Sequence, residues 1–419
     1  MDNNNIILNA DAIKAEKKKY FANFMWKLIV CIAVIYGVQI ILSLPMWILS
    51  GVFEALRTRL HGDFIQTYSR LADNGTVNTI ESVLSYVILL ISDGIGTLTL
   101  FLLTKKSHAA PEKKNMKFGY WFVAFMCCFG IGGVGSVIGS ILNVLLIIPG
   151  GICGGLVKAL GFLSAPGPTN VVDNLLYADD SWIYLIFGVI TVGIVAPIFE
   201  ELIFRKIFID STSKYGFAAS VLLSALAFGI FHGNFVQFFY ATGLGILFGY
   251  IYAATGKLRY TIFLHMGYNL YAALIMPFAR KLIPSKAKEE MQMATDFLTK
   301  RLETVQTWEE MGRIFRNYSD YMGRITSRYP TVIPGMILVT LVTLFYLLLI
   351  LIGIILAIVF LKKALNYRKT MMLGQKGTKP CAAFNWGSIL FWVLGGGIFI
   401  LYYLLLNIAS FIGALGISV

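Results

Sequence analysis

Residues 182–209 read WIYLIFGVITVGIVAPIFEELIFRKIFI, an apolar run that carries two adjacent acids, Glu200 and Glu201, near its end. About 20 apolar residues in helical conformation are needed to cross the ~30 Å hydrocarbon core of a bilayer. Because lipid offers the backbone no hydrogen-bond partners, such a run is expected to be a helix. This stretch therefore predicts a membrane helix that holds ionisable groups, and the rest of the chain is interpreted outward from it.

The whole chain has the composition of a membrane protein. Of its 419 residues, 57% are hydrophobic and 14% are charged, and the mean hydropathy is +0.74. Soluble domains average about 45–50% apolar and about 25% charged residues. No Asp, Glu, Lys or Arg occurs between Lys117 and Lys158, between Lys214 and Lys257, or after residue 379. A single soluble domain, a disordered chain and a disulfide scaffold are thereby excluded.

We expect an all-α fold, a polytopic transmembrane helix bundle of about nine spans. The apolar runs that could form these spans are 24–44, 83–104, 119–148, 182–209, 217–233, 235–255, 260–279, 332–361 and 385–412. The first run is too long for the apolar region of a signal peptide and has no obvious small-residue cleavage site, so we expect it to be retained.

The distribution of Lys and Arg predicts the topology. The net charge of +13 is concentrated in short loops beside apolar runs, namely the N-terminal segment and the loops that begin near residues 105, 205, 257 and 362. Cytosolic loops carry such an excess, so the N-terminus is expected in the cytosol and the C-terminus outside. The positive charge therefore indicates membrane topology, and we expect no nucleic-acid partner.

These assignments divide the chain into five parts. They are a cytosolic segment at 1–23, N-terminal spans at 24–180, a core at 181–280 that holds most of the intramembrane ionisable groups, an extracytoplasmic insert at 281–330, and C-terminal spans at 331–419. Within 285–318, apolar residues recur at helical spacing among charged ones, which predicts one amphipathic helix. We interpret this helix as packed on the ends of the protein's own membrane spans. The alternative is that it lies on the extracytoplasmic surface of the membrane.

Ionisable residues inside the spans are the main functional signal, because each costs at least ~2.5–3.5 kcal/mol on insertion scales. Glu201 and Arg205 are four residues apart on a helix and can form an ion pair. Glu200 is turned about 100° away from that pair, so its carboxyl is the one free for chemistry. Pro197 is expected to kink this helix and open it to water or substrate.

Two histidines lie on other spans. His232 ends the run Phe-Gly-Ile-Phe-His, and His265 is followed four residues later by Asn269, on the same helical face. Two histidines, an asparagine and an unpaired glutamate need mutual partners or a water-filled cavity, which predicts one shared site. Counting ~1.5 Å per residue from the cytosolic loops places His265 shallower than His232. A tilt, the kink at Pro197 or a re-entrant turn at 233–235 must therefore bring them level.

Such a set suits hydrolysis of a peptide bond. Glu200 can act as general base toward a water that His232 helps to hold, and His265 with Asn269 can donate hydrogen bonds to the oxygen of a tetrahedral intermediate. The alternative is a zinc site with Glu200, His232 and His265 as ligands and a water in the fourth position. No HExxH and no recognisable Ser or Cys nucleophile motif occurs in the sequence.

The three patterns Glu-Glu-x-x-x-Arg at 200–205, Phe-x-x-x-His at 228–232 and His-x-x-x-Asn at 265–269 occur in this order on successive spans. Together they resemble the motifs of the CPBP family, the Abi or type II CAAX prenyl endopeptidase-like intramembrane proteases. The resemblance covers roughly 180–280. It implies that Glu200 is the catalytic carboxylate, that His232 assists it, and that His265 and Asn269 form the oxyanion site.

The same resemblance implies supporting roles for Glu201 and Arg205 in the first motif and for Phe228, which opens the second. The family is often labelled as metalloproteases, although a metal-free glutamate mechanism is also argued for it. No metal ligand is therefore assigned and no cofactor is firmly implied, with zinc as the alternative.

The expected function is that of an intramembrane endopeptidase acting on a membrane-associated peptide or protein. The chain looks bacterial, which indicates the plasma membrane, and related bacterial proteins are associated with peptide maturation or self-protection against bacteriocins. Two alternatives remain: a non-catalytic scaffold or bacteriocin-immunity protein, and a proton-coupled transporter that uses the same Glu and His as a relay. A transporter would favour inverted internal repeats, and none stands out.

Three further patterns are interpreted as structural. The run Gly130 to Gly135 satisfies GxGxxG but lies within an apolar span, which favours close helix packing over dinucleotide binding. Asp93, within Ser-Asp-Gly at 92–94, is interpreted as a helix cap or a member of a polar network. The adjacent Cys127 and Cys128 form no CxxC and are expected in the core.

Overall fold

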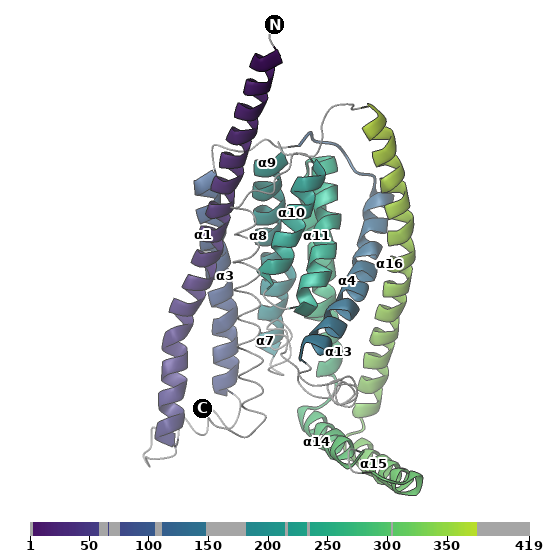
Figure 1. The fold of residues 1–419 in the computed structure, drawn as a ribbon. Coiled ribbons are helices and arrows are strands. Elements are labelled where there is room, and N and C mark those ends of the chain that lie inside the picture. The colour runs from purple at the N-terminus through teal and green to yellow at the C-terminus, as the bar shows by residue number, and fades with distance from the viewer. Residues whose placement is uncertain are drawn as a thin grey trace.

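A computed structural model of the chain describes residues 3–57, 66, 76–104, 111–147, 182–213, 217–232, 235–302 and 305–374. Within these ranges every regular element is a helix, which confirms the all-α fold (Figure 1). The longer elements are α1 (Asn3–Arg57), α3 (Thr76–Thr104), α4 (Phe118–Ile147), α10 (Phe217–Phe231), α11 (Phe235–Thr255), α12 (Leu258–Leu270), α14 (Ser285–Leu302), α15 (Trp308–Arg328) and α16 (Val332–Gly374).

Two further runs are continuous helices interrupted by π-helical turns. The first consists of α7 (Trp182–Gly188), η1 (Val189–Val195), α8 (Ala196–Glu201), η2 (Leu202–Ile207) and α9 (Phe208–Thr212). In the second, α12 continues through η4 (Tyr271–Ile275) into α13 (Met276–Lys281).

Seven helices in the described part of the chain are long and apolar enough to cross a membrane. They are Ala22–Leu49, Thr79–Thr104, Phe118–Leu142, Trp182–Thr212, Gln237–Thr255, Leu258–Lys281 and Val332–Val359, and Ala218–Phe231 is a shorter apolar helix. These eight correspond to the first eight expected spans. The ninth, at 385–412, lies outside the described residues, so the total of nine stays a prediction.

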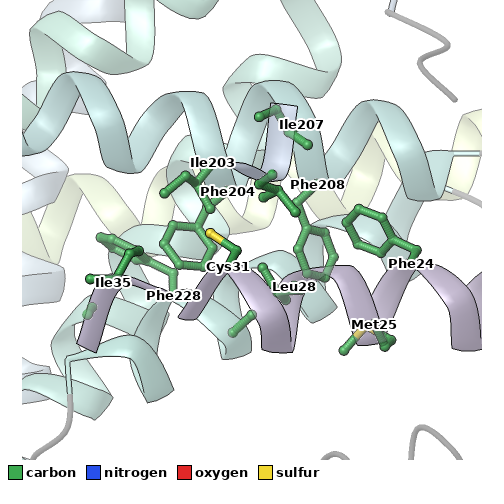
Figure 2. Packing of buried hydrophobic residues seen from close by; sticks show 13 residues of the cluster. Phe24, Met25, Leu28, Cys31, Ile35, Ile203, Phe204, Ile207, Phe208 and Phe228 are labelled. Carbon is green, nitrogen blue, oxygen red and sulfur yellow. The ribbon is translucent and has the colours of Figure 1, made fainter. Parts of the chain in front are cut away.

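One hydrophobic cluster packs α1 against the helix that carries Glu200 and Glu201 (Figure 2). The α1 side chains face those of η2, α9 and α10, and the rings of Phe24 and Phe208 meet edge to face with centroids 5.1 Å apart. The cluster consists of Phe24, Met25, Leu28, Cys31, Ile35, Leu100, Ile203, Phe204, Ile207, Phe208, Ala227, Phe228 and Ala241. This packing fixes the position of the segment that follows Glu200 and Glu201.

The glycines of α4 allow close helix contacts. A Cβ at Gly130 would collide with the backbone of Gly353 in α16, and one at Gly135 would collide with the backbone of Tyr240 in α11. The GxGxxG run is thus a packing surface, as interpreted from the sequence. α4 therefore lies between α11 and α16 and packs closely against both (Figure 1).

A tight turn sets the start of α12. Gly256 has a φ of 61°, in the left-handed region that glycine adopts without strain. Its backbone approaches the carbonyls of Pro111 and Glu112 so closely that a Cβ would collide with them. The amide of Lys114 donates to the carbonyl of Thr255 at 2.8 Å, which ties this turn to the segment before α4.

The insert after α13 contains two helices, so the expectation of one amphipathic helix across 285–318 is wrong. The break has a local cause: the side chain of Thr307 accepts a hydrogen bond from the Glu310 amide, and Glu310 Oε2 accepts one from the Gln306 amide, which together start a new helix. The pair lies at one end of the bundle (Figure 1). Its base packs through Ala287 and Ile325, and its side of the membrane stays a prediction.

Candidate active site

The two acids of the first motif lie on a short α-helical segment between two π-helical ones. The first π-helical segment ends where Ala196 N–H donates to Thr191 O, five residues back, immediately before Pro197. Pro197 lies in the first turn of α8, where a missing N–H is best tolerated. The kink that the sequence predicts at Pro197 therefore takes the form of a π-helical turn, a feature often found at functional sites.

Glu201 and Arg205 form the ion pair that their spacing predicts. Arg205 Nε lies 3.2 Å from Glu201 Oε2, and neither side chain is exposed. The guanidinium carbon also lies 4.4 Å from the ring centroid of Phe228 and 5.4 Å from that of Phe248. The buried positive charge is thus held by one carboxylate and two aromatic faces.

His265 on α12 lies between the two acids. Its Nδ1 is 3.1 Å from Glu201 Oε1, and its Nε2 is 3.5 Å from Glu200 Oε2. An ionised carboxylate only accepts hydrogen bonds, so Nδ1 carries the proton toward Glu201. Glu200, whose side chain is 14% exposed, is thereby left facing Nε2.

His232 at the end of α10 joins the same region through Phe228. Its Nδ1 donates to the Phe228 carbonyl at 2.8 Å, which leaves Nε2 as the acceptor in the neutral ring. The Phe228 ring centroid lies 4.8 Å from that of His232 and 5.6 Å from that of His265. One aromatic ring thus contacts both imidazoles, and the predicted difference in depth between the two histidines does not separate them.

Asn269 lies one turn beyond His265 on α12. Its Nδ2 donates to the Val192 carbonyl at 3.0 Å. Val192 belongs to the π-helical segment η1, where the backbone pairing is shifted. This bond joins the third motif to the helix of the first motif and uses one of the two N–H groups of the amide.

Some residues near the acids were not singled out from the sequence. Thr261, one turn before His265, is buried and interacts with Glu201, while its hydroxyl donates to the Leu258 carbonyl at 3.0 Å. Phe248 of α11 lies under Arg205 and next to His265. Spacing from His265 could have identified Thr261, whereas only the packing of α11 identifies Phe248.

Asp93 of α3 is buried beside the site, although the sequence favoured a structural role for it. The side chain is 5% exposed and interacts electrostatically with Glu200. It does not begin or end a helix, since α3 runs from Thr76 to Thr104, so the expectation of a helix cap is wrong. The other expectation, membership of a polar network, remains.

The alternative role for Glu200, His232 and His265 is that of zinc ligands. Within the described part of the chain, no three His, Cys, Asp or Glu side chains are arranged to hold a metal ion together. Glu201 is bound to Arg205 and His265, and the Nδ1 of His232 is bound to a backbone carbonyl. Binding through Nδ1 leaves Nε2 of both histidines available, as zinc ligation would need, but in the described residues Glu200, His232 and His265 are not gathered around one point, so no step below uses a metal.

Known proteins match the region that contains these residues. Residues 182–271, which include all three motifs, match the family described as type II CAAX prenyl endopeptidase Rce1-like. Over 88 residues the chain is 34% identical to YdiL of Bacillus subtilis (strain 168), a protein named as a membrane peptidase. That match covers 21% of this chain and 36% of the length of YdiL. No solved structure matches the chain.

Proposed function

We propose that this chain, whose segment 182–271 matches the type II CAAX prenyl endopeptidase Rce1-like family, is a member of the CPBP family and an intramembrane endopeptidase. Its substrate would be a membrane-associated peptide or protein, cleaved by a water that Glu200 and His232 activate. The observation that carries this proposal is the convergence of Glu200, Glu201 and His265 inside the bundle, with one imidazole between two carboxyl groups. Buried ionisable groups of this kind are functional by default in a membrane protein.

Glu200 is the general base of the proposed reaction. It accepts one proton from the water as the water oxygen bonds to the peptide carbonyl carbon. The same proton then passes to the leaving nitrogen as the C–N bond breaks, which restores the carboxylate. His232, whose Nε2 is an acceptor when Nδ1 donates to Phe228 O, helps to hold the water.

Asn269 and His265 are the proposed donors to the oxyanion. The bond to Val192 O orients the Asn269 amide and leaves its second N–H for the developing negative oxygen. His265 is oriented by Glu201 through Nδ1, so donation from Nε2 requires the imidazolium form. Glu201 and Arg205 support the site by fixing His265 and the α8 backbone.

The proposed location is the bacterial plasma membrane, with the N-terminus in the cytosol as the basic loops predict. The site then lies nearer the cytosolic ends of its helices, so cytosolic or lateral access is favoured. A bacteriocin-immunity role rests on the family resemblance alone and belongs to the same proposal.

The test uses lipid-reconstituted full-length protein and a diverse peptide library that includes prenylated members, with products read by mass spectrometry. Glu200→Gln should abolish cleavage, because glutamine cannot accept the proton. Glu81→Gln is the matched control, since it makes the same change elsewhere in the spans, and it should cleave like wild type. Cleavage by Glu200→Gln at the wild-type rate would exclude Glu200 as the base.

A chelator arm tests the zinc alternative in the same assay. Activity that survives chelation supports the glutamate mechanism. Activity that is lost under chelation and restored by zinc would move Glu200, His232 and His265 to ligand roles. Absence of cleavage across the library would favour the scaffold or transporter alternatives.

A further inference from the structure

Asp93 is a buried carboxyl group that the three motifs do not include. It lies on α3, outside the segment matched by the family, and 5% of its surface is exposed. Its Oδ1 atom is buried and has no hydrogen-bond partner within the described part of the chain. Contacts from α1 reach its neighbours: Gln39 Nε2 donates to Ser92 Oγ at 3.1 Å, and Cys31 Sγ donates to Gly96 O at 3.2 Å.

The packing of α3 brings Asp93 to the level of Glu200. Leu100 of α3 joins the cluster that contains Ile203, so α3 packs against the helix that carries Glu200. One residue after Asp93, a Cβ at Gly94 would lie 3.6 Å from Cζ of Phe199, the residue before Glu200. Asp93 accordingly interacts electrostatically with Glu200.

Among the described residues, the buried carboxyl groups of Asp93 and Glu200 each have an oxygen without a hydrogen-bond donor. Glu200 Oε2, like Asp93 Oδ1, is buried without a hydrogen-bond partner in the described residues. Two ionised carboxylates cannot donate hydrogen bonds to each other. A water has two O–H donors and can bridge them. Bridging waters typically bind where several buried polar groups converge.

We propose that Asp93 is a second water-binding carboxylate of the site, which holds the attacking water together with Glu200. This inference rests on the proposed function and adds a residue to it. One O–H of the water points to Glu200 and is transferred to it as the oxygen bonds to the peptide carbon. The other O–H stays on the oxygen and is shared by Asp93 and Nε2 of His232, so the lone pair that attacks has a defined direction.

The activity test compares Asp93→Asn with Asp210→Asn in the reconstituted full chain. Asparagine places an N–H₂ donor opposite Glu200, which then binds Glu200 directly in place of the water. The kcat should fall at least about tenfold while KM changes less than about twofold. Asp210 is an equally buried aspartate that accepts hydrogen bonds from Tyr252 at 2.8 Å and Lys206 at 2.6 Å. Its variant should keep kcat, and a wild-type kcat in Asp93→Asn would overturn the proposal.

A second measurement does not depend on protease activity. Thermal unfolding of Asp93→Asn, Glu200→Gln and the double variant forms a double-mutant cycle. Asp93→Asn should raise Tm in the wild-type background, because it removes one of two buried carboxyl groups that interact electrostatically, and should change Tm little in the Glu200→Gln background. Additive changes in Tm would overturn the pairing. If the wild type cleaves no peptide, the proposed function fails, while this cycle still decides whether Asp93 and Glu200 form a pair.

Discussion

His265 Nδ1 lies 3.1 Å from Glu201 Oε1, and this hydrogen bond joins α12 to α8 across 64 residues of sequence. It connects the third motif to the first inside the bundle. The same carboxyl group also pairs with Arg205, so Glu201 serves two buried partners at once. The adjacent Glu200 has no ion pair with Arg205, so its carboxyl group is available for the proposed role of general base.

Glu201→Gln should lower the free energy of unfolding by about 3–5 kcal/mol, the usual cost of leaving one partner of a buried ion pair alone. The Arg205 charge would then be buried without a carboxylate. Denaturant titration of the detergent-purified protein measures this loss. Glu200→Gln is the matched control and should cost clearly less. Equal losses in the two variants would contradict the assignment of the ion pair.

Arg205→Lys should not behave as a conservative change. The guanidinium carbon lies over the Phe228 ring, 4.4 Å from its centroid, and an ammonium cannot reproduce the contact of a planar, weakly hydrated cation with that ring. We expect a loss of about 1–3 kcal/mol in the free energy of unfolding. The exposed Arg316 provides the control, and Arg316→Lys should leave stability unchanged. A stable Arg205→Lys protein would show that the aromatic contact contributes little.

Gly130→Ala should destabilise the bundle although alanine is the better helix former. A Cβ at this position meets the backbone of Gly353, so α4 and α16 must move apart. Overpacking of this kind typically costs about 1–3 kcal/mol. At Gly119, by contrast, a Cβ has nothing within 4 Å, and Gly119→Ala should be neutral or stabilising by up to about 1 kcal/mol. Thermal unfolding of both variants compares the two sites directly.

Asn269→Ala should reduce kcat about 10²- to 10³-fold, the usual effect of removing one oxyanion donor. KM should change little, because the interaction is made in the transition state. Steady-state cleavage of the best library peptide measures both constants. Asn317→Ala, on an exposed position of α15, is the control. An unchanged kcat in Asn269→Ala would restrict Asn269 to its bond with Val192 O.

Much of the fold and part of the site could be read from local sequence. Apolar runs long enough to cross a bilayer are expected to be helices, whatever they pack against, and seven helices of the described residues have that length. The Glu201 and Arg205 pair followed from a spacing of four, which one helix enforces by itself. The same local rule could not predict the break before Trp308, because that depends on a cap formed by Thr307 and Glu310.

Contacts between helices were decided by the tertiary structure. Spacing alone left Glu200 without a neighbour, whereas packing places His265 on one side of it and Asp93 of α3 near it. The Phe228 ring touches both histidines, which counting residues along separate helices could not predict. The physical reason is that apolar length determines which segments cross the membrane, while the rotation and register of each helix depend on side chains of several others. The residues of each motif are therefore local features of the sequence, and their meeting in one site is a property of the packed bundle.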